Sequence, residues 1–359
     1  MKKIDKILLL SIIIISLFGL LMIYSSSSIW AEYKFDDPYK FLKTQSIFLI
    51  IGYIIIYIIS KIPYQTYLKY SNLILISCIA LLILVLIPGI GTIRNGSRSW
   101  FGIGSFGIQP SEFAKLGIII FTSKYLSKNK IKDIKTSVLP ILSIVILIFG
   151  LIMLQPDFGT GMIIVVTIIV LLFISGVKMN FFIKLGTIGL IGIIVLIIIA
   201  PYRLKRIISF INPWADPLGS GFQIIQSLYA IGPSGLLGTG LGNSIQKHFY
   251  LPEPQTDFIF SIISEELGFI GVIFVITLFT IIIYRGINIS LKQEDNFAKY
   301  LSFGLTFSLA FQTILNLMVV VGLIPVTGVT LPFLSYGGSS LLVSMTYIGI
   351  LLNISRYNR

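Results

Sequence analysis

The sequence is poor in the residues from which soluble proteins build their surfaces, disulfides and metal sites. Charged residues make up only 11% of the chain, whereas an ordinary soluble domain has about 25%. With one cysteine, Cys78, no disulfide can form within the chain. One histidine, His248, without a cysteine partner, argues against a zinc site. These scarcities exclude a disulfide-stabilised domain and predict no metal-binding residues.

Long apolar runs are what the sequence has in abundance. Hydrophobic residues make up 55% of the 359 residues, and repeated runs are long enough to cross a hydrocarbon layer of about 30 Å. We expect the first run to be a retained helix rather than a cleaved signal peptide. The sequence therefore predicts an all-α polytopic membrane protein with ten transmembrane helices. The expected spans are about 7–24, 44–60, 70–88, 111–127, 138–154, 160–177, 182–200, 260–284, 300–322 and 336–354.

The distribution of lysine and arginine predicts the orientation. The formal net charge is +13, and the excess falls in the segments that would face the cytoplasm if both termini lie inside. Because cytoplasmic loops are enriched in Lys and Arg, we expect a multi-pass protein of the cell membrane with both termini cytoplasmic. The excess of basic residues then reflects membrane topology and does not indicate a nucleic-acid partner. We expect one domain, residues 1–359, with a large extracytoplasmic loop at about 201–259, between helices 7 and 8.

Polar residues of the predicted outer face gather around the fourth span. The loop 88–110 is rich in glycine and turn formers and contains Arg98 and Trp100. Glu112 and Lys115, in "QPSEFAK", are three residues apart and share one helix face just inside the membrane. We expect a buried ion pair. The residues leave open whether the pair only locks the helix in place or also contacts a substrate.

Two further charged motifs follow along the chain, and the second has both a structural and a functional interpretation. Asp157, in "QPDFGTG", suits the N-cap of the sixth span. Arg203, Lys205 and Arg206 open the long loop on the side where basic residues are otherwise sparse. They would serve either as interfacial anchors or as a site for an anionic headgroup such as a lipid pyrophosphate.

The remaining external stretches are rich in glycine and proline. The series "GPSGLLGTGLGNSIQK" lacks the GK[ST] of a nucleotide-binding loop, so we expect close backbone packing or a flexible flap. The stretch "GLIPVTGVTLPFLSYGGSS" predicts a re-entrant segment buried in protein. Ser339 and Ser340 then open the tenth span, where a helix N-terminus could face an anion.

The segment "YLPEPQTDFIF" places two carboxylates at the mouth of the eighth span. Its prolines exclude a regular helix around Glu253, for which we expect a stiff, extended backbone. Asp257 is either an N-cap or a general base. Glu265 and Glu266 follow without a lysine or arginine among them, so their charges must be relieved by residues from elsewhere, by water or by protonation. We expect an outward-facing polar cavity that is lined by acids on one side and by cations on the other.

Taken together, these motifs resemble the SEDS membrane proteins (shape, elongation, division and sporulation), a family that includes FtsW, RodA and the stage V sporulation protein E. The resemblance covers nearly the whole chain. The stretches "NGSRSW" and "QKHFYLPEPQTD" are more similar to the division and sporulation branch than to the rod-elongation branch. Gln255 stands where many relatives have histidine, which argues against proton transfer at that position.

The resemblance implies a peptidoglycan glycosyltransferase that polymerises lipid II into β-1,4 glycan strands at the outer face of the cytoplasmic membrane. Asp257, in "TDF", would be the general base. The implied partner is a class B penicillin-binding protein transpeptidase, and a divalent cation, Mg²⁺ or Mn²⁺, stays open. A lipid II flippase and a non-catalytic scaffold are the alternatives. The candidate substrate-binding residues are Arg98, Trp100, Glu112, Lys115, Arg203, Lys205, Arg206, Glu253 and Ser339.

Overall fold

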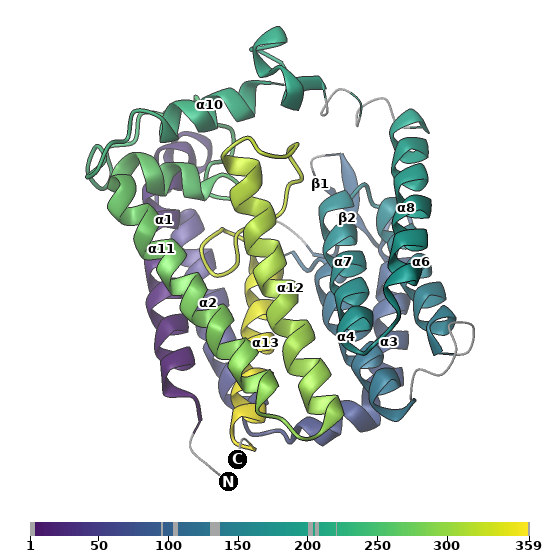
Figure 1. Cartoon of the computed structure of the whole chain (residues 1–359). Helices are drawn as coiled ribbons and strands as arrows, with labels where there is room; N and C mark the ends of the chain where they lie inside the picture. Colours follow the sequence, from purple (N-terminus) through teal and green to yellow (C-terminus); the bar gives the residue numbers. More distant parts are fainter. Residues whose placement is uncertain are drawn as a thin grey trace.

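The fold is a bundle of helices with one small hairpin (Figure 1). The structure, a computed structural model, describes residues 4–94, 96–102, 107–129, 137–199, 204, 208–219 and 221–357. The elements are α1 (Lys6–Phe35), α2 (Lys40–Ile59), α3 (Tyr64–Leu84), β1 (Thr92–Arg94), β2 (Ser97–Trp100), α4 (Pro110–Lys128), α6 (Leu139–Met153), α7 (Phe158–Ile174), α8 (Met179–Ile199), the 3-10 helix η1 (Pro213–Ala215), α10 (Phe222–Ile231), α11 (Ile259–Leu291), α12 (Asn296–Val320) and α13 (Gly338–Ser355).

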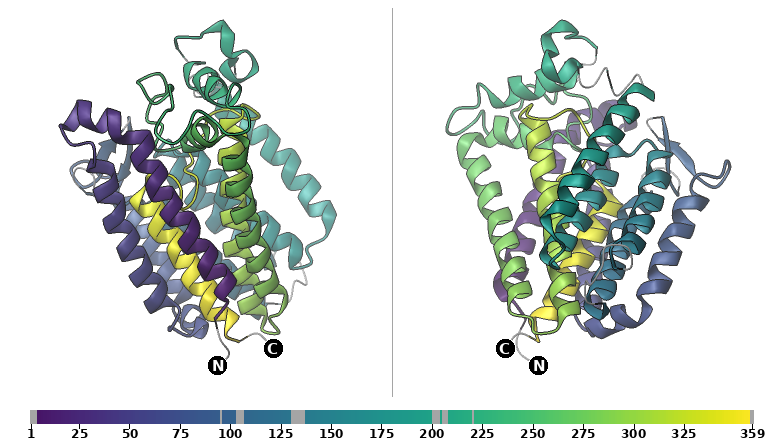
Figure 2. Two further views of the ribbon diagram at one scale, coloured as in Figure 1. Left: turned by 90° about the vertical axis from the view of Figure 1, so that its left-hand side faces the viewer. Right: turned by 45° about the vertical axis from the view of Figure 1, so that its right-hand side comes forward.

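The long helices run between the two ends of the bundle, and both termini lie at the same end (Figure 2). In the described part of the chain, six helices are long and apolar enough to cross a membrane, namely α1, α2, α3, α11, α12 and α13. Helices α6 and α7 are apolar but shorter. Helical structure is expected here because hydrocarbon offers no partner for a free backbone N–H or C=O group. The chain is therefore a mostly helical, multi-pass membrane protein.

Helix α13 lies at the centre of this bundle. Nearly all its residues are buried, and it packs against α2 and α12. At the end that holds the termini, Asp5 ties three helices together. Its carboxylate caps α1 by accepting from the Leu8 N–H at 3.0 Å, and it accepts from Arg285 Nε of α11 at 2.9 Å. Its own N–H donates to Ser355 Oγ of α13.

Two elements lie at the opposite end of the bundle and were not expected from the sequence. The predicted loop 88–110 contains an antiparallel hairpin of β1 and β2, which pairs Ile93 with Arg98. The Asn-Gly dipeptide at 95–96 is a strong hairpin signal, and Gly96 has the positive φ, +78°, that such turns use. Within the long loop, α10 lies across the end of the bundle (Figure 1).

Candidate active site

The segment between α12 and α13 enters the bundle without forming a helix. Residues 329, 331, 333 and 334 are buried, and α1 approaches them so closely that a Cβ on Gly19 would lie 2.3 Å from the Phe333 carbonyl oxygen. The predicted re-entrant segment is confirmed. We call residues 323–337 the re-entrant loop. Its backbone groups need partners from neighbouring helices, because water is excluded from them.

Helix α12 supplies two of these partners from one face. Gln312 and Asn316 are four residues apart, which places them one above the other about 6 Å along the helix. Gln312 Nε2 donates to the Thr330 carbonyl at 3.0 Å, and Asn316 Nδ2 donates to the Val329 carbonyl at 2.7 Å. Two consecutive residues of the re-entrant loop are therefore fixed to one helix face.

Asp257 is joined to the same face. Asn316 Nδ2 also donates to the Asp257 carbonyl oxygen at 2.7 Å. The Asp257 side chain is half-buried, and its Oδ1 lies 2.9 Å from the Thr256 hydroxyl. Helix α11 begins at Ile259 with Phe258 in the cap position and no side-chain capping bond. Asp257 therefore precedes the cap position, which counts against the capping interpretation.

The backbone before Asp257 differs from the expected extended approach. Glu253 has a φ of +44°, in the left-handed region, and its carbonyl accepts from the Thr256 N–H at 3.0 Å, as in a turn. Pro252 and Pro254 exclude a helix as expected, but the prediction of an extended backbone is wrong because this turn forms between them. Within the described part of the chain, the Glu253 carboxylate makes no hydrogen bond or ion pair.

Glu112 and Lys115 form the expected buried ion pair. Lys115 Nζ lies 2.9 Å from Glu112 Oε2, and the two side chains are 2% and 7% exposed. Lys115 Nζ also donates to Gln312 Oε1 at 2.6 Å. Because Gln312 holds Thr330 as well, the ion pair of α4 is connected through α12 to the re-entrant loop. Asp257 and the ion pair thus belong to one hydrogen-bonded assembly, although no bond between them is direct.

Asp157 and Ser339 fix the start of α4 from two sides. Asp157 caps α7 as predicted, accepting from the Thr160 N–H at 3.1 Å. Its second oxygen accepts from Gln109 Nε2 at 2.9 Å and Ser111 Oγ at 3.0 Å. Ser339 Oγ accepts from the Gln109 N–H at 2.9 Å and donates to the Gly107 carbonyl. The Ser339 hydroxyl is therefore already engaged in holding the segment before α4.

Glu265 and Glu266 do not line an acidic cavity wall, and that prediction is wrong. Both are buried. Glu266 Oε1 lies 3.0 Å from Lys247 Nζ and accepts from Ser25 Oγ of α1 at 2.7 Å. Glu265 accepts from the Ile245 N–H at 2.8 Å. Their charges are satisfied by a lysine and backbone donors from the long loop, so their role in this structure is to hold that loop.

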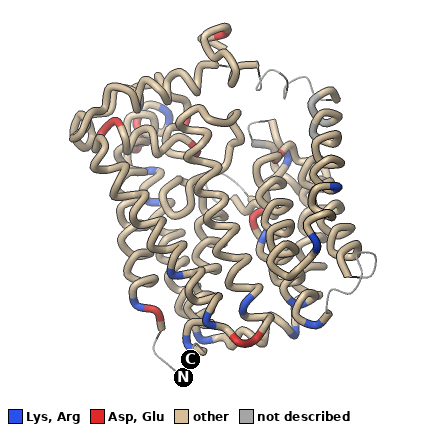
Figure 3. Tube along the Cα trace, in the orientation of Figure 1, with Lys and Arg blue, Asp and Glu red and all other residues tan. Residues whose placement is uncertain are grey.

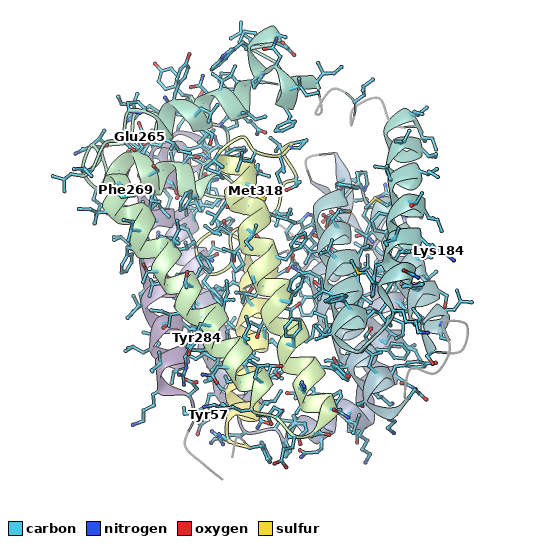
Figure 4. The ribbon with its side chains drawn as sticks, in the orientation of Figure 1. Tyr57, Lys184, Glu265, Phe269, Tyr284 and Met318 are labelled. Atoms are coloured by element: carbon cyan, nitrogen blue, oxygen red, sulfur yellow. The ribbon has the colours of Figure 1, made fainter. Side chains whose placement is uncertain are left out.

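The same loop fills a break in α11. Gly268 has φ +61° and ψ −156°, which interrupts the helix. The break frees two carbonyls and two N–H groups, and loop 235–240 supplies a partner for each, which confirms the expected close backbone packing. Figure 4 places Glu265 and Phe269 at this bend, at the same end of the bundle as Met318 of α12. The four bonds join Thr239 N to Glu265 O (2.9 Å), Gly240 N to Glu266 O (2.9 Å), Phe269 N to Gly235 O (3.0 Å) and Ile270 N to Leu236 O (3.2 Å).

The remaining candidate residues lie on β2 or outside the described residues. Arg98 and Trp100 are half-buried on β2, where Arg98 Nη1 lies 3.5 Å from the Leu86 carbonyl oxygen. Arg203, Lys205 and Arg206 lie outside the described residues. Among the residues that the structure describes, no group of three or more His, Cys, Asp or Glu side chains could hold a metal ion.

Three residues of this region were missed from the sequence. Gln312 and Asn316 are polar side chains four apart inside an apolar helix, a pattern that marks one inward-facing polar stripe. Lys247 is the buried cation that neutralises Glu266. Its position at the end of the glycine series gave no comparable signal, because a lysine in a long loop is usually solvated.

Comparison with known proteins gives consistent matches along the chain. A family model for FtsW, RodA and SpoVE, described as "Cell cycle protein", matches residues 5–359. Stage V sporulation protein E of Bacillus subtilis is 53% identical over 362 residues, covering 100% of this chain and 99% of that protein. The probable peptidoglycan glycosyltransferase FtsW of Trichlorobacter lovleyi is 42% identical over 98% of this chain and 93% of that protein.

Solved structures share the fold over the same extent. RodA of Thermus thermophilus, a rod shape determining protein, has a TM-score of 0.73 at 27% identity, covering 99% of this chain and 98% of that one. A chain from work on the structural coordination of polymerization and crosslinking by a peptidoglycan synthase complex has a TM-score of 0.81 at 29% identity, covering 99% and 98%.

Proposed function

The chain belongs to the FtsW, RodA and SpoVE family of cell cycle proteins, and from this we propose that it is a peptidoglycan glycosyltransferase that polymerises lipid II. Its FtsW relatives are named probable peptidoglycan glycosyltransferases. The observation that carries the proposal is the placement of Asp257, a half-buried carboxylate beside the re-entrant loop. Its main chain is fixed by Asn316, which presents the carboxylate at the end of the bundle opposite the termini.

The proposed reaction is a single displacement between two saccharides. The 4-hydroxyl of an acceptor GlcNAc attacks C1 of a donor MurNAc, and its proton passes to the Asp257 carboxylate. The new C1–O4 bond forms as the C1–O bond to the undecaprenyl pyrophosphate breaks, and the electron pair leaves with the pyrophosphate. An α-linked donor then gives a β-1,4 bond. The step needs a base, which typically contributes 10²–10⁴-fold, but no enzyme nucleophile.

The surroundings of Asp257 suit a base that receives a proton. The Thr256 hydroxyl lies 2.9 Å from Asp257 Oδ1 and 2.7 Å from the Glu253 carbonyl oxygen, so its single proton can be donated to either acceptor. This neighbour can orient one carboxylate oxygen. Glu253, in the turn just before, would bind polar groups of the acceptor saccharide.

Cations must stabilise the charge that develops on the leaving pyrophosphate. We assign this role to Arg203, Lys205 and Arg206, with Arg98 and Trp100 as further substrate-binding candidates. Lys115 is less suited to direct contact, because Glu112 and Gln312 already occupy its ammonium group. Arg203→Ala or Arg206→Ala should raise KM for lipid II in folded protein. Unchanged kinetics in both variants would instead make these cations membrane anchors.

A divalent cation, Mg²⁺ or Mn²⁺, remains a separate proposal. The described residues offer no preformed cluster of ligands, so no step of the mechanism above depends on a metal. Mg²⁺ is commonly bound by one or two carboxylates together with substrate phosphates. Loss of polymerisation after treatment with a chelator, with recovery on adding Mg²⁺ or Mn²⁺, would support a bound ion, and full activity in the chelator would contradict it.

We also propose ten membrane spans with both termini in the cytoplasm. Helices α4, α6, α7 and α8 lie at the predicted ranges beside the six longer spans. In Figure 3 the lysine and arginine residues gather at the end of the bundle that holds both termini, as expected for cytoplasmic loops. Asp257 and the long external loop then face outward, where a membrane-bound sugar carrier would be used.

The alternatives receive less support from the distribution of charge. A lipid II transporter would need polar residues continuing through the spans to the cytoplasmic side. Among the described residues, the buried charged residues come from the start of α4 and from the Lys247–Glu266 region, and the buried polar residues along α12, such as Ser302, Thr306 and Gln312, are uncharged. A scaffold would not need the Asp257 carboxylate.

We propose a class B penicillin-binding protein transpeptidase as the partner. The support is the fold shared with a chain of a peptidoglycan synthase complex that coordinates polymerization and crosslinking. Purification of the full chain from its own cell membranes should recover such a transpeptidase, and recovery without one would contradict this assignment. The activity itself is tested by incubating purified protein with lipid II and no other enzyme. Glycan polymer supports the proposal, and unreacted lipid II with a correctly folded protein contradicts it.

A further inference from the structure

One buried amide connects the carboxylate-bearing segment with the re-entrant loop. Asn316 is 1% exposed, and its Nδ2 lies 2.7 Å from the carbonyl oxygens of both Asp257 and Val329. A side-chain amide has two N–H donors, and here both face acceptors. Since a flipped amide would place an oxygen against two carbonyl oxygens, the assignment of nitrogen and oxygen is fixed by chemistry.

The chain segments before and after Asp257 are both held in place. After Asp257 the chain continues into Phe258 and Ile259, which are fully buried. Before it, the Gln255 carbonyl accepts from the Tyr336 N–H of the re-entrant loop at 2.8 Å. Asn316 therefore fixes the main chain of Asp257 at a point where both neighbouring segments are already held. Loss of the amide would release the Asp257 carbonyl without unfolding the helices around it.

We propose that Asn316 is a positioning residue for glycosyl transfer: it sets the place of the Asp257 carboxylate relative to the re-entrant loop. This rests on the proposed function, in which Asp257 takes the proton of the acceptor hydroxyl. A displacement of about 1 Å at a reacting group can cost on the order of 100-fold in rate. The amide is thus expected to act on the rate constant of the bound complex and not on substrate binding.

Two variants and a matched control separate positioning from stability. Asn316→Asp removes both donors, and Asn316→Ser, which keeps one donor and adds no charge, serves if the first does not fold. The control is Asn353→Asp. Asn353 is as buried and also bridges two backbone groups, donating to the Ser60 carbonyl at 2.9 Å and accepting from the Tyr64 N–H at 3.1 Å, but at the C-terminal end of α13.

The measurement is the rate of glycan formation from lipid II by folded, purified variants, with kcat and KM determined separately. We expect a loss of at least about tenfold in kcat at unchanged KM for the Asn316 variants. Asn353→Asp should lower the unfolding temperature but not the kcat of the folded fraction. Normal kcat in folded Asn316 variants would overturn the proposal, as would an equal loss of kcat in the control.

A double-mutant cycle tests whether Asn316 acts through Asp257. In an Asp257→Asn background, adding Asn316→Ser should lower the residual rate less than about twofold, because the group being positioned is gone. A further tenfold loss would assign Asn316 an independent role and overturn the proposal. If Asp257→Asn alone is fully active, the proposal that Asp257 is the general base and the proposal that Asn316 positions it are both contradicted. If Asp257→Asn is inactive and Asn316→Ser is normal, only the positioning role fails.

Discussion

At the scale of single residues, each buried lysine of the described chain faces a carboxylate, and the remaining buried carboxylate, Glu265, accepts from Ser244 Oγ and the Ile245 N–H. Lys115 faces Glu112, and Lys247 faces Glu266, each pair with additional polar partners. Such pairing is needed because a lone charge removed from water carries a penalty of several kcal/mol. Asp257 differs from these residues because it is half-buried and stands at the surface of the assembly. Asp257 is therefore more accessible than the paired charges of α4 and of the Lys247–Glu266 region.

The Glu112–Lys115 pair gives a prediction at this scale. Glu112→Gln or Lys115→Met leaves the other charge buried without its partner, and each should lower the free energy of unfolding by roughly 3–5 kcal/mol. The double variant should lose less than the sum, because it buries no unpaired charge. The measurement is denaturant unfolding of all four proteins in detergent. Simple additivity of the two single losses would show that the pair does not act as a unit.

At the scale of elements, the feature that positions the site is the broken helix α11. Loop 235–240 inserts at Gly268 and satisfies the backbone groups that the break frees. The segment from Ile259 to Leu267, which begins two residues after Asp257, can therefore take a direction different from the rest of α11. Glu265 and Glu266 strengthen the same junction by holding residues 244–247.

Gly268→Ala tests this junction. A Cβ at this position would lie 2.4 Å from the Gly238 nitrogen, and the backbone has φ +61° and ψ −156°, a conformation that costs a residue other than glycine about 1–3 kcal/mol. We expect a loss of stability of that order and faster proteolysis within 235–247. The control is Gly150→Ala in α6, where no atom lies within 4 Å. Equal stability of the two variants would contradict the account of the junction.

Much of the helical arrangement could be predicted from the sequence, because apolar runs of sufficient length have few alternatives in a membrane. The ends of the helices were less predictable. Helix α1 continues to Phe35, beyond the predicted residue 24, and Ser25 in this extension donates to Glu266. That partner is 241 residues away along the chain. The partner of Lys247, Glu266, is 19 residues away along the chain, beyond the reach of a local sequence pattern.

At the scale of the whole molecule, function depends on which end of the bundle faces outward. Both termini lie at one end (Figure 1), and α10 and the hairpin lie at the other. In the proposed function, a carrier-linked saccharide would reach Asp257 from the second end. The distribution of lysine and arginine and the position of the proposed base therefore favour the same orientation, with the termini inside and Asp257 outside.

Cysteine labelling tests that orientation. In a Cys78→Ala background, Leu218→Cys should react with a membrane-impermeant thiol reagent added to intact cells, because Leu218 is 89% exposed and is assigned to the outside. Asn129→Cys, which is exposed at the end of α4, should react only after the membrane is opened. The reverse pattern would place Asp257 on the cytoplasmic side and remove the basis of the proposed reaction.

The central claim is that the Asp257 carboxylate is the base of glycosyl transfer, and Asp257→Asn tests it most directly. Asparagine keeps the size of the side chain and its hydrogen-bonding oxygen but is not basic. The matched control is Asp295→Asn at a true helix cap, where Asp295 accepts from the Ala298 N–H at 3.1 Å and asparagine caps about as well.

The measurement is the rate of glycan polymer formation from lipid II by the purified, folded variants, with lipid II binding followed separately. The account predicts that Asp257→Asn binds lipid II but polymerises it roughly 100-fold or more slowly, while Asp295→Asn polymerises it at nearly the normal rate. A normal rate of polymerisation by Asp257→Asn would contradict the account.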